Sequence, residues 1–454
     1  MERRDFLKLA SMTGLTVAVG NHVSSPGAAL AKPANTFYVN FAFGGGCDHT
    51  SLWNPKGALT EADAAPNGNP DAMNRYLKSE IREDSTSGVS WAPMFLARSI
   101  VGNQAAVDDA MQFETFMTAY AKDMLVIRGI DIQTNAHDTG SRTSVTGLPA
   151  ERTPAFGAIV SSVLLPSAPM SFISFGGYSE TAGFTPVTRL GNLDAIRRLA
   201  YPYRRDPNNV DQLFYSDEQA AFIADARKAR YDAKMSQQKL PKIQNTMSTL
   251  YLSRLGQNEL KDLVSYLPDD VLPGLAGQMQ LAAAAYKAGL AVAANFGSQA
   301  GWDHHDQVDT NVVNSMGSAF NADSGIPGAI RVLEDLDIYG KSACITFTSD
   351  FARTPGYNMG NGKDHWSVTS MVLLGHINGK KIKPGVKGGS TERDGLMGVD
   401  PVTGVVKDGA PLNIKVGHIQ NNLRKLAGVE NSEQARRFPM SVPAGELTQL
   451  VEVV

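Results

Sequence analysis

Five short hydrophobic runs stand out along the chain, each rich in β-branched or aromatic side chains and bounded by glycine or polar residues. Runs of this length and composition predict β-strands. The first run ends in three consecutive glycines, Gly44 to Gly46, which indicates a strand that leads directly into a turn. The predicted strands are residues 36–43, 124–130, 171–175, 342–348 and 367–374.

Between these strands, apolar residues follow a helical spacing, most clearly at 278–296 and 326–336. Strands that alternate with helices predict an α/β fold with a mostly parallel central sheet flanked by helices. Two long polar stretches, near 55–120 and 195–270, are expected to be helical and loop insertions that cap this sheet. After residue 380, glycine turns predict a hairpin, followed by a short helix near 418–426.

The N-terminus has the pattern of an export signal. Arg3 and Arg4 precede Phe-Leu-Lys, a mildly apolar stretch follows, and Ala29-Leu30-Ala31 offers a small-residue cleavage site. The pattern predicts a twin-arginine signal peptide at residues 1–31 and one α/β domain at 32–454. The protein is then expected to meet the twin-arginine translocase and to work in the periplasm or outside the cell. The alternative is an amphipathic N-terminal helix with a chance arginine pair.

Composition narrows the classes of partner. The net charge of −3 provides no broad basic surface, so nucleic acid is not an expected partner. No segment after the leader is long and apolar enough to predict a stable membrane span. The two cysteines, Cys47 and Cys344, fall near opposite ends of their strands, so we expect them to stay unpaired, with Cys47 as a free thiol at the mouth of a site.

Metal-binding side chains gather beside the predicted strand ends, where open α/β sheets bind their ligands. Six of the eight histidines lie in or beside the segments concerned or, for His376, directly after the fifth strand. Carboxylates and imidazoles brought together from several strands are the ligands of a divalent metal site. The segments are 47–49, 135–143, 301–306, 349–354 and 362–366.

Each segment also has a plainer interpretation. Asp48 after a glycine turn is a common turn residue, and His137 or Asp138 is a common helix cap. The run from Asp303 to Asp306 is less easily structural, because four metal-competent side chains follow one another. We therefore expect one cleft with a divalent metal, in which the polar atoms of any two of Asp303, His305 and His365 lie within about 8 Å. Its expected members are Asp48, Asp303, His305, Asp350 and His365.

Three motifs are similar to those of the bacterial family known as domain of unknown function 1501. That family has a twin-arginine leader, a glycine turn with an aspartate, and then Gly-Trp-Asp-x-His, Ser-Glu-Phe-Gly-Arg-Thr and Gly-Thr-Asp-His-Gly segments. The resemblance runs over essentially the whole chain after the leader. The corresponding segments here are Gly301-Trp302-Asp303-His304-His305, Ser349-Asp350-Phe351-Ala352-Arg353-Thr354 and Gly362-Lys363-Asp364-His365-Trp366.

The family is similar in turn to the alkaline phosphatase superfamily, which includes sulfatases. This resemblance implies an alkaline-phosphatase-like fold with two divalent metals at strand ends. Zinc, manganese, calcium and magnesium all remain open as the metal. The ligands implied for one ion are Asp48 and Asp350, and those for the other are Asp303, His365 and either His305 or His304.

The chain also departs from the superfamily pattern. Phe351 stands where the superfamily has a histidine ligand, so His49 or His137 would have to replace it. The sulfatase Cys/Ser-x-Pro-x-Arg motif is absent, and a nucleophile is instead expected at the start of the helix after the second strand, where backbone N–H groups would receive an anion. The remaining catalytic candidates are Thr139, Ser141, Thr143 and His137, with Arg142 and Arg353 to hold the anion.

The expected function is metal-dependent hydrolysis of a phosphate or sulfate ester, on a small molecule or a polysaccharide. The alternative is a non-catalytic exported protein that keeps the fold and binds a metal or a polysaccharide. A hydroxyl nucleophile beside the metal would favour the enzyme. A dinucleotide-binding role is disfavoured, because Gly44 to Gly46 lack the spacing of the dinucleotide fingerprint.

Overall fold

The structure is a computed structural model. It describes residues 34–454 apart from 167, 169, 192, 202–203, 207, 241–242, 244–246, 248–256 and 298–299. The predicted leader, residues 1–31, therefore lies outside the described residues. Within the described part of the chain, no helix is long and apolar enough to cross a membrane.

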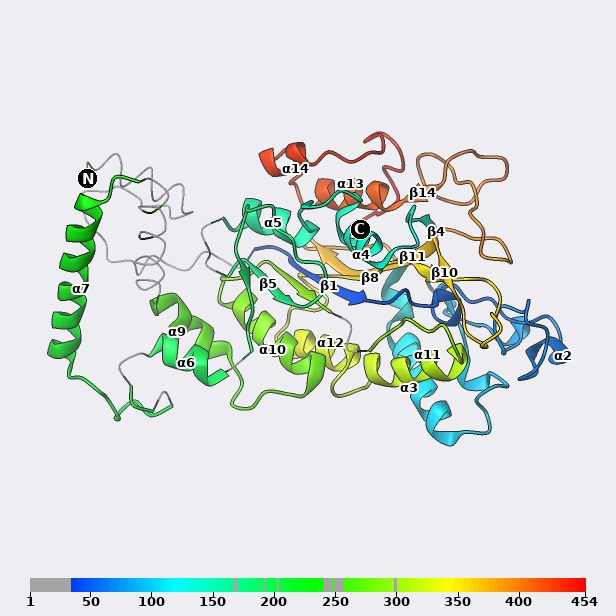
Figure 1. Ribbon diagram of the computed structural model, residues 1–454, viewed down its shortest axis with the longest axis horizontal. Coiled ribbons are helices and arrows are strands. Elements are labelled where there is room, and N and C mark those ends of the chain that lie inside the picture. The colour runs from blue at the N-terminus through cyan, green and yellow to red at the C-terminus, as the bar shows by residue number, and fades with distance from the viewer. Residues whose placement is uncertain are drawn as a thin grey trace.

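A large central sheet dominates the molecule (Figure 1). Its strands are β1 (Phe37–Phe43), β4 (Met124–Asp131), β5 (Phe172–Phe175), β6 (Val187–Thr188), β7 (Ala293–Phe296), β8 (Ala343–Ser349), β11 (Val368–Ile377), β12 (Lys380–Lys381), β13 (Gly385–Gly388) and β14 (Ile414–Lys415). The order along the sheet is β13-β4-β11-β8-β1-β7-β5-β6, with β12 beside β11 and β14 beside β4. Most neighbours are parallel, which confirms the predicted mostly parallel α/β sheet.

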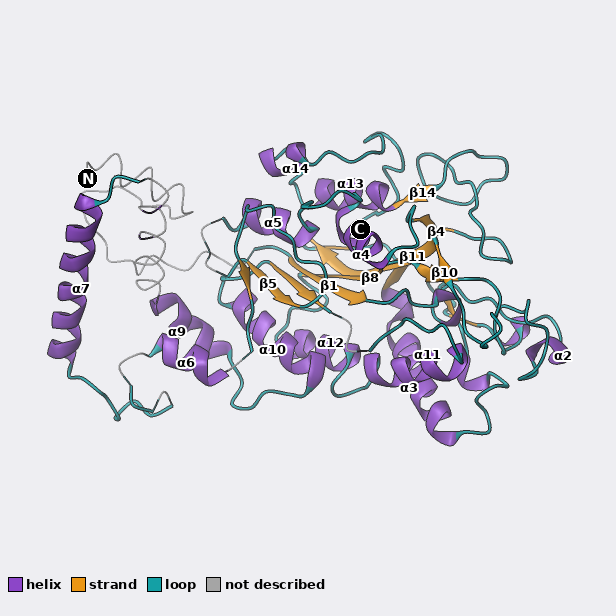
Figure 2. Cartoon of the chain, viewed as in Figure 1, coloured by secondary structure: helices purple, strands orange, loops and turns teal. Residues whose placement is uncertain are grey.

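Helices cover both faces of the sheet (Figure 2). One layer holds α3 (Gln104–Tyr120), α10 (Gly274–Lys287), α11 (Val308–Ala319) and α12 (Ile326–Asp335), and the other holds α4 (His137–Thr146), α5 (Phe156–Leu164) and α13 (Val416–Leu426). Strand β1 shows how one strand serves both layers. Phe37 and Val39 belong to the core under the first layer, whereas Tyr38 points to the second.

All five predicted strands are present, but one predicted helix is partly wrong. Residues 278–296 were expected to form a single helix, whereas α10 ends at Lys287 and residues Ala293–Phe296 form β7 between β1 and β5. Gly289, with a φ of 73°, provides the break. Alanine-rich sequence on both sides of it suits a buried helix and a buried strand equally, so hydrophobic spacing could not separate the two.

The two expected insertions differ in character. Residues 55–120 contain α2 (Glu61–Ala64), a small hairpin of β2 (Arg82–Glu83) and β3 (Ser90–Trp91), and also α3, which packs with α11 against the sheet. Residues 195–270 contain most of α6 (Leu193–Ala200), α7 (Asp217–Gln237) and α9 (Gln257–Tyr266). Helix α7 lies at one end of the molecule, far from the sheet (Figure 1).

The direction of β11 brings the third motif, residues 362–366, to the edge of the sheet where the site lies. β11 runs antiparallel to both β4 and β8, with Val368 opposite Asp131. Its beginning therefore shares an edge with the carboxyl ends of β1, β4 and β8, and His365 in β10 (His365–Trp366), which pairs with β9 (Ala352–Arg353), reaches that edge. His376, at the other end of β11, lies at the opposite edge, which corrects its grouping with the site.

The two cysteines are unpaired, as predicted. The expected position of Cys47 at the mouth of a site is wrong, because its side chain is buried behind the glycine turn. Burial raises the pKa of this thiol to about 12, so it is not a reactive thiolate at neutral pH.

Candidate metal centre

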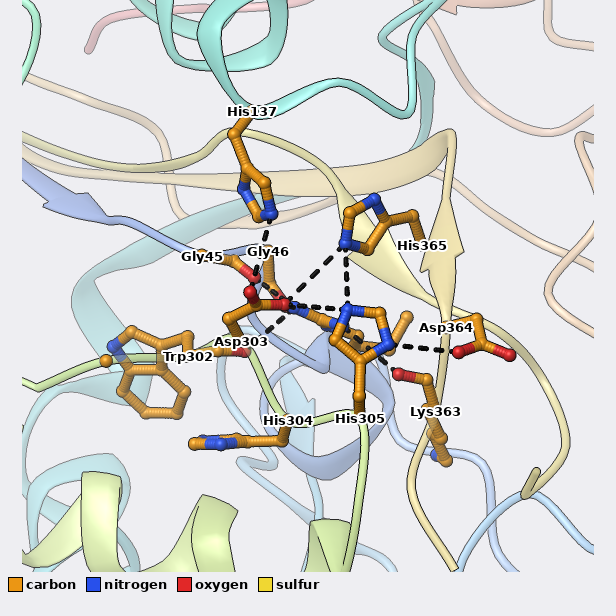
Figure 3. Close-up of polar contacts among 12 residues, drawn as sticks. Gly45, Gly46, His137, Trp302, Asp303, His304, His305, Lys363, Asp364 and His365 are labelled. Carbon is orange, nitrogen blue, oxygen red and sulfur yellow. Dashed lines mark hydrogen bonds and ion pairs between the residues drawn. The ribbon is translucent and has the colours of Figure 1, made fainter. Parts of the chain in front are cut away.

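Four side chains from three segments converge beyond the carboxyl ends of the strands (Figure 3). His305 Nε2 lies 3.0 Å from Asp303 Oδ1, and His365 Nε2 lies 3.6 Å from the same oxygen. His137 Nε2 lies 3.6 Å from Asp303 Oδ2. The Nε2 atoms of His305 and His365 are only 3.1 Å apart. These four residues are called the His/Asp cluster below.

The other nitrogen of each imidazole is held from outside the cluster. The pairs are His137 Nδ1 with Asp350 Oδ2 at 2.7 Å, His305 Nδ1 with Asp364 Oδ1 at 3.0 Å, and His365 Nδ1 with the carbonyl oxygen of Asn135 at 2.7 Å. A carboxylate and a carbonyl oxygen only accept hydrogen bonds, so each Nδ1 carries a hydrogen. In the neutral imidazoles each Nε2 then presents a lone pair to the cluster.

This arrangement is unfavourable unless a positive charge lies among the lone pairs. Neutral His305 and His365 would direct two lone pairs at each other across 3.1 Å. The guanidinium of Arg353, whose Nη1 lies 3.4 Å from His305 Nε2, offsets part of this repulsion, and a proton or a metal ion would remove the rest. Metal-binding histidines commonly donate their second N–H to a carboxylate or a carbonyl, which fixes the tautomer and the ring orientation. All three imidazoles of the cluster have such a partner.

Arg353 holds Asp303 of the cluster in place. Its side chain is fully buried and donates to Asp303 Oδ1 at 2.5 Å, to the carbonyl oxygen of Gly46 at 2.7 Å and to that of Lys363 at 3.1 Å. Further hydrogen bonds reach the carbonyl oxygens of Gly45 and Trp302. Partial burial alone would raise the pKa of Asp303, but Arg353 and the neighbouring histidines hold it below its usual value.

Two glycines allow the segments to approach this closely. A Cβ atom on Gly45, whose φ is 110°, would lie 2.7 Å from the backbone nitrogen of Asp303. A Cβ on Gly140 in α4 would lie 2.1 Å from the backbone oxygen of Asp350. Any side chain at these positions would push apart the turn after β1 and helix α4 from the rest of the site.

The geometry fits one small cation with nitrogen-rich ligands. One ligand atom from each of His137, Asp303 and His365 lies within 4.8 Å of the others. Two donors on one ion at about 2 Å lie roughly 3–4 Å apart, close to the separations seen here. Imidazoles suit zinc and its transition-metal neighbours, whereas calcium and magnesium prefer oxygen ligands. The side chain of Asp303 is 49% exposed, so the cluster is open to solvent.

A protein-family profile described as "Protein of unknown function (DUF1501)" matches residues 39–406, which is most of the chain. The chain belongs to this family. The match includes every residue of the His/Asp cluster, so the centre lies inside the part that the DUF1501 family shares. No curated protein matches the chain.

Among solved structures, one described as "Crystal structure of Ps i-CgsB in complex with k-i-k-neocarrahexaose" is similar to this DUF1501 chain. The likeness covers 70% of this chain and 67% of that one, with 9% sequence identity and a TM-score of 0.30. A score this low carries no argument about function.

Two of the expected ligands lie outside the cluster of this DUF1501 chain. Asp48 is buried and forms an ion pair with Lys363, its Oδ2 lying 2.7 Å from Nζ. Asp350 is only 2% exposed and supports His137 instead of facing the cluster, while also accepting hydrogen bonds from the backbone N–H groups of Gly45 and Gly46. The geometry therefore does not bring together the Asp48–Asp350 set that the superfamily resemblance implied.

His304 also lies outside the cluster, although it adjoins His305. Its Nε2 lies 3.1 Å from Ser315 Oγ, and its ring is turned away from the other imidazoles (Figure 3). Burial lowers the pKa of His304 to about 4. Successive side chains on an extended segment point in opposite directions, so only one of two adjacent histidines can face the cluster.

Of the expected catalytic residues, His137 joins the cluster as a candidate ligand and Arg353 holds Asp303. Among the described residues, no hydrogen bond joins the hydroxyl of Thr139 or Ser141 to the cluster, and Thr143 Oγ1 donates to the carbonyl of Thr139. Arg142 donates to the carbonyl of Pro149. The donors of Arg353 are taken by protein oxygens and by Nε2 of His305, which lies 3.4 Å from Nη1, so Arg353 has no donor left to hold an anion.

Sequence reasoning also missed the supporting groups. Asp364 and the carbonyl of Asn135 orient two of the imidazoles, and neither was named as a functional residue. Asp364 had a signal, since it directly precedes His365 in the third motif. Asn135 had none, because a backbone carbonyl is present at every residue.

Proposed function

We propose that this protein is a hydrolase of phosphate or sulfate esters that uses one divalent transition metal, most simply zinc. The His/Asp cluster would hold the ion through three Nε2 atoms and Asp303. The observation that carries the proposal is that His137, Asp303 and His365 each offer one ligand atom within 4.8 Å of the others. The hydrogen bonds made by Nδ1 of the two imidazoles leave their Nε2 atoms as acceptors, with His305 beside them. The order of the three motifs and the α/β sheet support a relationship to the alkaline phosphatase superfamily.

A bound divalent cation would supply a Lewis acid that polarises the ester and offsets its negative charge. The chain itself contributes orientation and access. Asp350 and Asp364 hold two imidazoles, Arg353 holds Asp303, and the half-exposed cluster leaves an open side for the substrate. No hydroxyl candidate is hydrogen-bonded to the cluster in the described residues, so the proposal takes water as the attacking group.

The lack of a hydroxyl group hydrogen-bonded to the cluster also favours a second function. In the described residues the candidate hydroxyl nucleophiles form no hydrogen bond with the cluster, and the donors of Arg353 are used within the site, which suits an exported protein that binds a metal without catalysis. Activity measurements separate the two functions, whereas both require the metal.

Adjacent histidines provide a matched test of the proposal. Purified protein should contain about one equivalent of zinc or a similar metal, and chelation should abolish hydrolysis of a panel of phosphate and sulfate esters until metal is returned. His305→Ala should lose the metal and the activity, because it removes one Nε2 donor. His304→Ala, which removes a neighbouring imidazole that faces Ser315, should retain both.

The outcomes divide cleanly. If the metal-loaded protein hydrolyses none of the esters in the panel, the protein is the non-catalytic metal-binding protein and not a hydrolase of these esters. Equal metal content in His305→Ala and His304→Ala would show that the His/Asp cluster is not the metal site. Metal analysis by mass spectrometry and colorimetric release of phosphate or sulfate provide the two measurements.

We also propose export by the twin-arginine translocase, on the strength of the N-terminal pattern alone. Replacement of Arg3 and Arg4 by lysine should leave uncleaved precursor in the cytoplasm, because the translocase recognises the arginine pair. Fractionation followed by N-terminal sequencing measures this. Export of the lysine variant at the normal level would contradict the assignment.

A further inference from the structure

A second polar constellation lies beside the cluster and is not used by the proposed function. The side chains of Lys363 and Asp48 are 0% and 1% exposed, and the ion pair between them spans 2.7 Å. Two buried charges with no access to water are costly unless every donor and acceptor is satisfied. The environment of Lys363 Nζ meets that requirement.

The ammonium group of Lys363 is enclosed by oxygen atoms. Besides Asp48 Oδ2, it lies 3.2 Å from Thr50 Oγ1 and 3.0 Å from Asn74 Oδ1. An ammonium has three N–H donors, so these three oxygens use all of them. The oxygens of Asp48, Thr50 and Asn74 are called the oxygen cage below.

Other hydrogen bonds hold the cage in shape. Ser51 Oγ donates to Asp48 Oδ2 at 2.9 Å and lies 3.0 Å from Asn74 Oδ1. Asn74 Nδ2 donates to the carbonyl oxygens of Thr50 and Lys56. The cage oxygens are therefore oriented by groups other than Lys363, and removal of the lysine side chain would leave them facing one another.

An oxygen-only shell with a single carboxylate is the type of environment that hard cations such as Mg²⁺ and Ca²⁺ occupy in proteins. Burial alone would raise the pKa of Asp48, but Lys363 holds it below its usual value, so the carboxylate stays ionised. The ammonium group of Lys363 thus neutralises the charge of Asp48, as a bound cation would.

Lys363 is also joined to the cluster through its backbone. Its N–H donates to the carbonyl oxygen of His304 at 3.1 Å, and its own carbonyl accepts from Arg353 at 3.1 Å. Asp364 and His365 follow directly in the chain and face the cluster (Figure 3). The buried side chain therefore anchors the segment that delivers these two residues.

We propose that the ammonium of Lys363 is a tethered cation that fills a latent hard-cation site, the oxygen cage. Its second task is to anchor Asp364 and His365. The latent cation site does not rest on the proposed function. The proposal differs from an ordinary buried ion pair in one respect: a free cation can replace the lysine.

Two variants of Lys363 test this replacement. Lys363→Ala empties the cage, and Lys363→Met removes the charge but fills most of the space. Both should melt at a lower temperature than the wild type, because Asp48 loses its counter-charge. Millimolar Mg²⁺ or Ca²⁺ should raise the melting temperature of Lys363→Ala in a saturable way, since binding to the folded state stabilises it. Lys363→Met and the wild type should not respond.

Calorimetric titration with Mg²⁺ or Ca²⁺ should count one added cation in Lys363→Ala and none in the wild type. A folded Lys363→Ala protein that neither binds nor responds to these cations overturns the latent site. Should Lys363→Ala fail to fold, the double variant Asp48→Asn/Lys363→Met decides the matter. It should recover most of the melting temperature that Lys363→Met loses, and no recovery overturns the role of Lys363 as a counter-cation.

The same titration in a His305→Ala background separates this inference from the proposed function. Cation rescue of Lys363→Ala should persist there, because His305 is not part of the cage. If the protein loses its transition metal but Mg²⁺ or Ca²⁺ still raises its melting temperature, the oxygen cage and the His/Asp cluster are independent sites.

Discussion

Asp303→Ala is expected to abolish metal binding. Its carboxylate faces all three imidazoles and accepts from Arg353, so it is the one acidic group shared by the whole cluster. Loss of an outer-shell partner typically costs about 10–100-fold in metal affinity, and loss of a ligand with its charge should cost more. Without Asp303, the positive charge of Arg353 would also oppose a cation directly.

Asp306→Ala is the matched control for this prediction. It removes an exposed carboxylate from the same segment, and Asp306 forms no ion pair among the described residues. Metal content after purification and competition with a coloured chelator give the stoichiometry and affinity of each variant. An Asp303→Ala protein with wild-type metal content would exclude Asp303 as a ligand.

Arg353→Met is expected to cause the largest loss of stability. Arg353 joins the turn after β1, the segment before α11 and the segment before β10, and the buried backbone carbonyls among its partners would lose their donor. Each buried acceptor left without a partner typically costs about 1–3 kcal/mol in the free energy of unfolding. The cluster should also lose metal affinity, since Asp303 would no longer be oriented.

Arg353→Lys provides the graded comparison. Lysine keeps the charge but has three donors instead of five, so the free energy of unfolding should lie between those of the wild type and Arg353→Met. Urea denaturation followed by circular dichroism measures all three proteins. If Arg353→Met were as stable as the wild type and only substrate binding were weaker, Arg353 would be a substrate-binding residue and not a structural one.

Local sequence patterns determined the elements of the sheet. The five strands were visible because buried strands need β-branched and aromatic residues bounded by turns, and those preferences act within a few residues. The segment 278–296 was the exception. A run of small apolar residues satisfies both helix and strand, and the choice depends on whether neighbouring strands offer hydrogen bonds, as β1 and β5 do for β7.

The chemistry of the site was predicted only in part. Asp303, His305 and His365 were named from the sequence and lie together, whereas Asp48 was expected among them and pairs with Lys363 instead. Sequence shows which side chains lie near a strand end, but not which way each one turns. A lysine and an aspartate that are both buried must pair, because each loses its hydration and an unpaired buried charge is costly. Only the packed structure shows which charged residues are buried together.

The sequence by itself therefore determined the fold class, five of the ten strands of the central sheet and the segments that carry the metal-binding side chains. The tertiary structure alone decided that β11 runs antiparallel, which brings His365 to the correct edge and sends His376 to the other. It also decided which nitrogen of each imidazole faces the cluster. These features depend on contacts between residues tens to hundreds of positions apart. The local sequence around either residue does not show which distant residue it will contact.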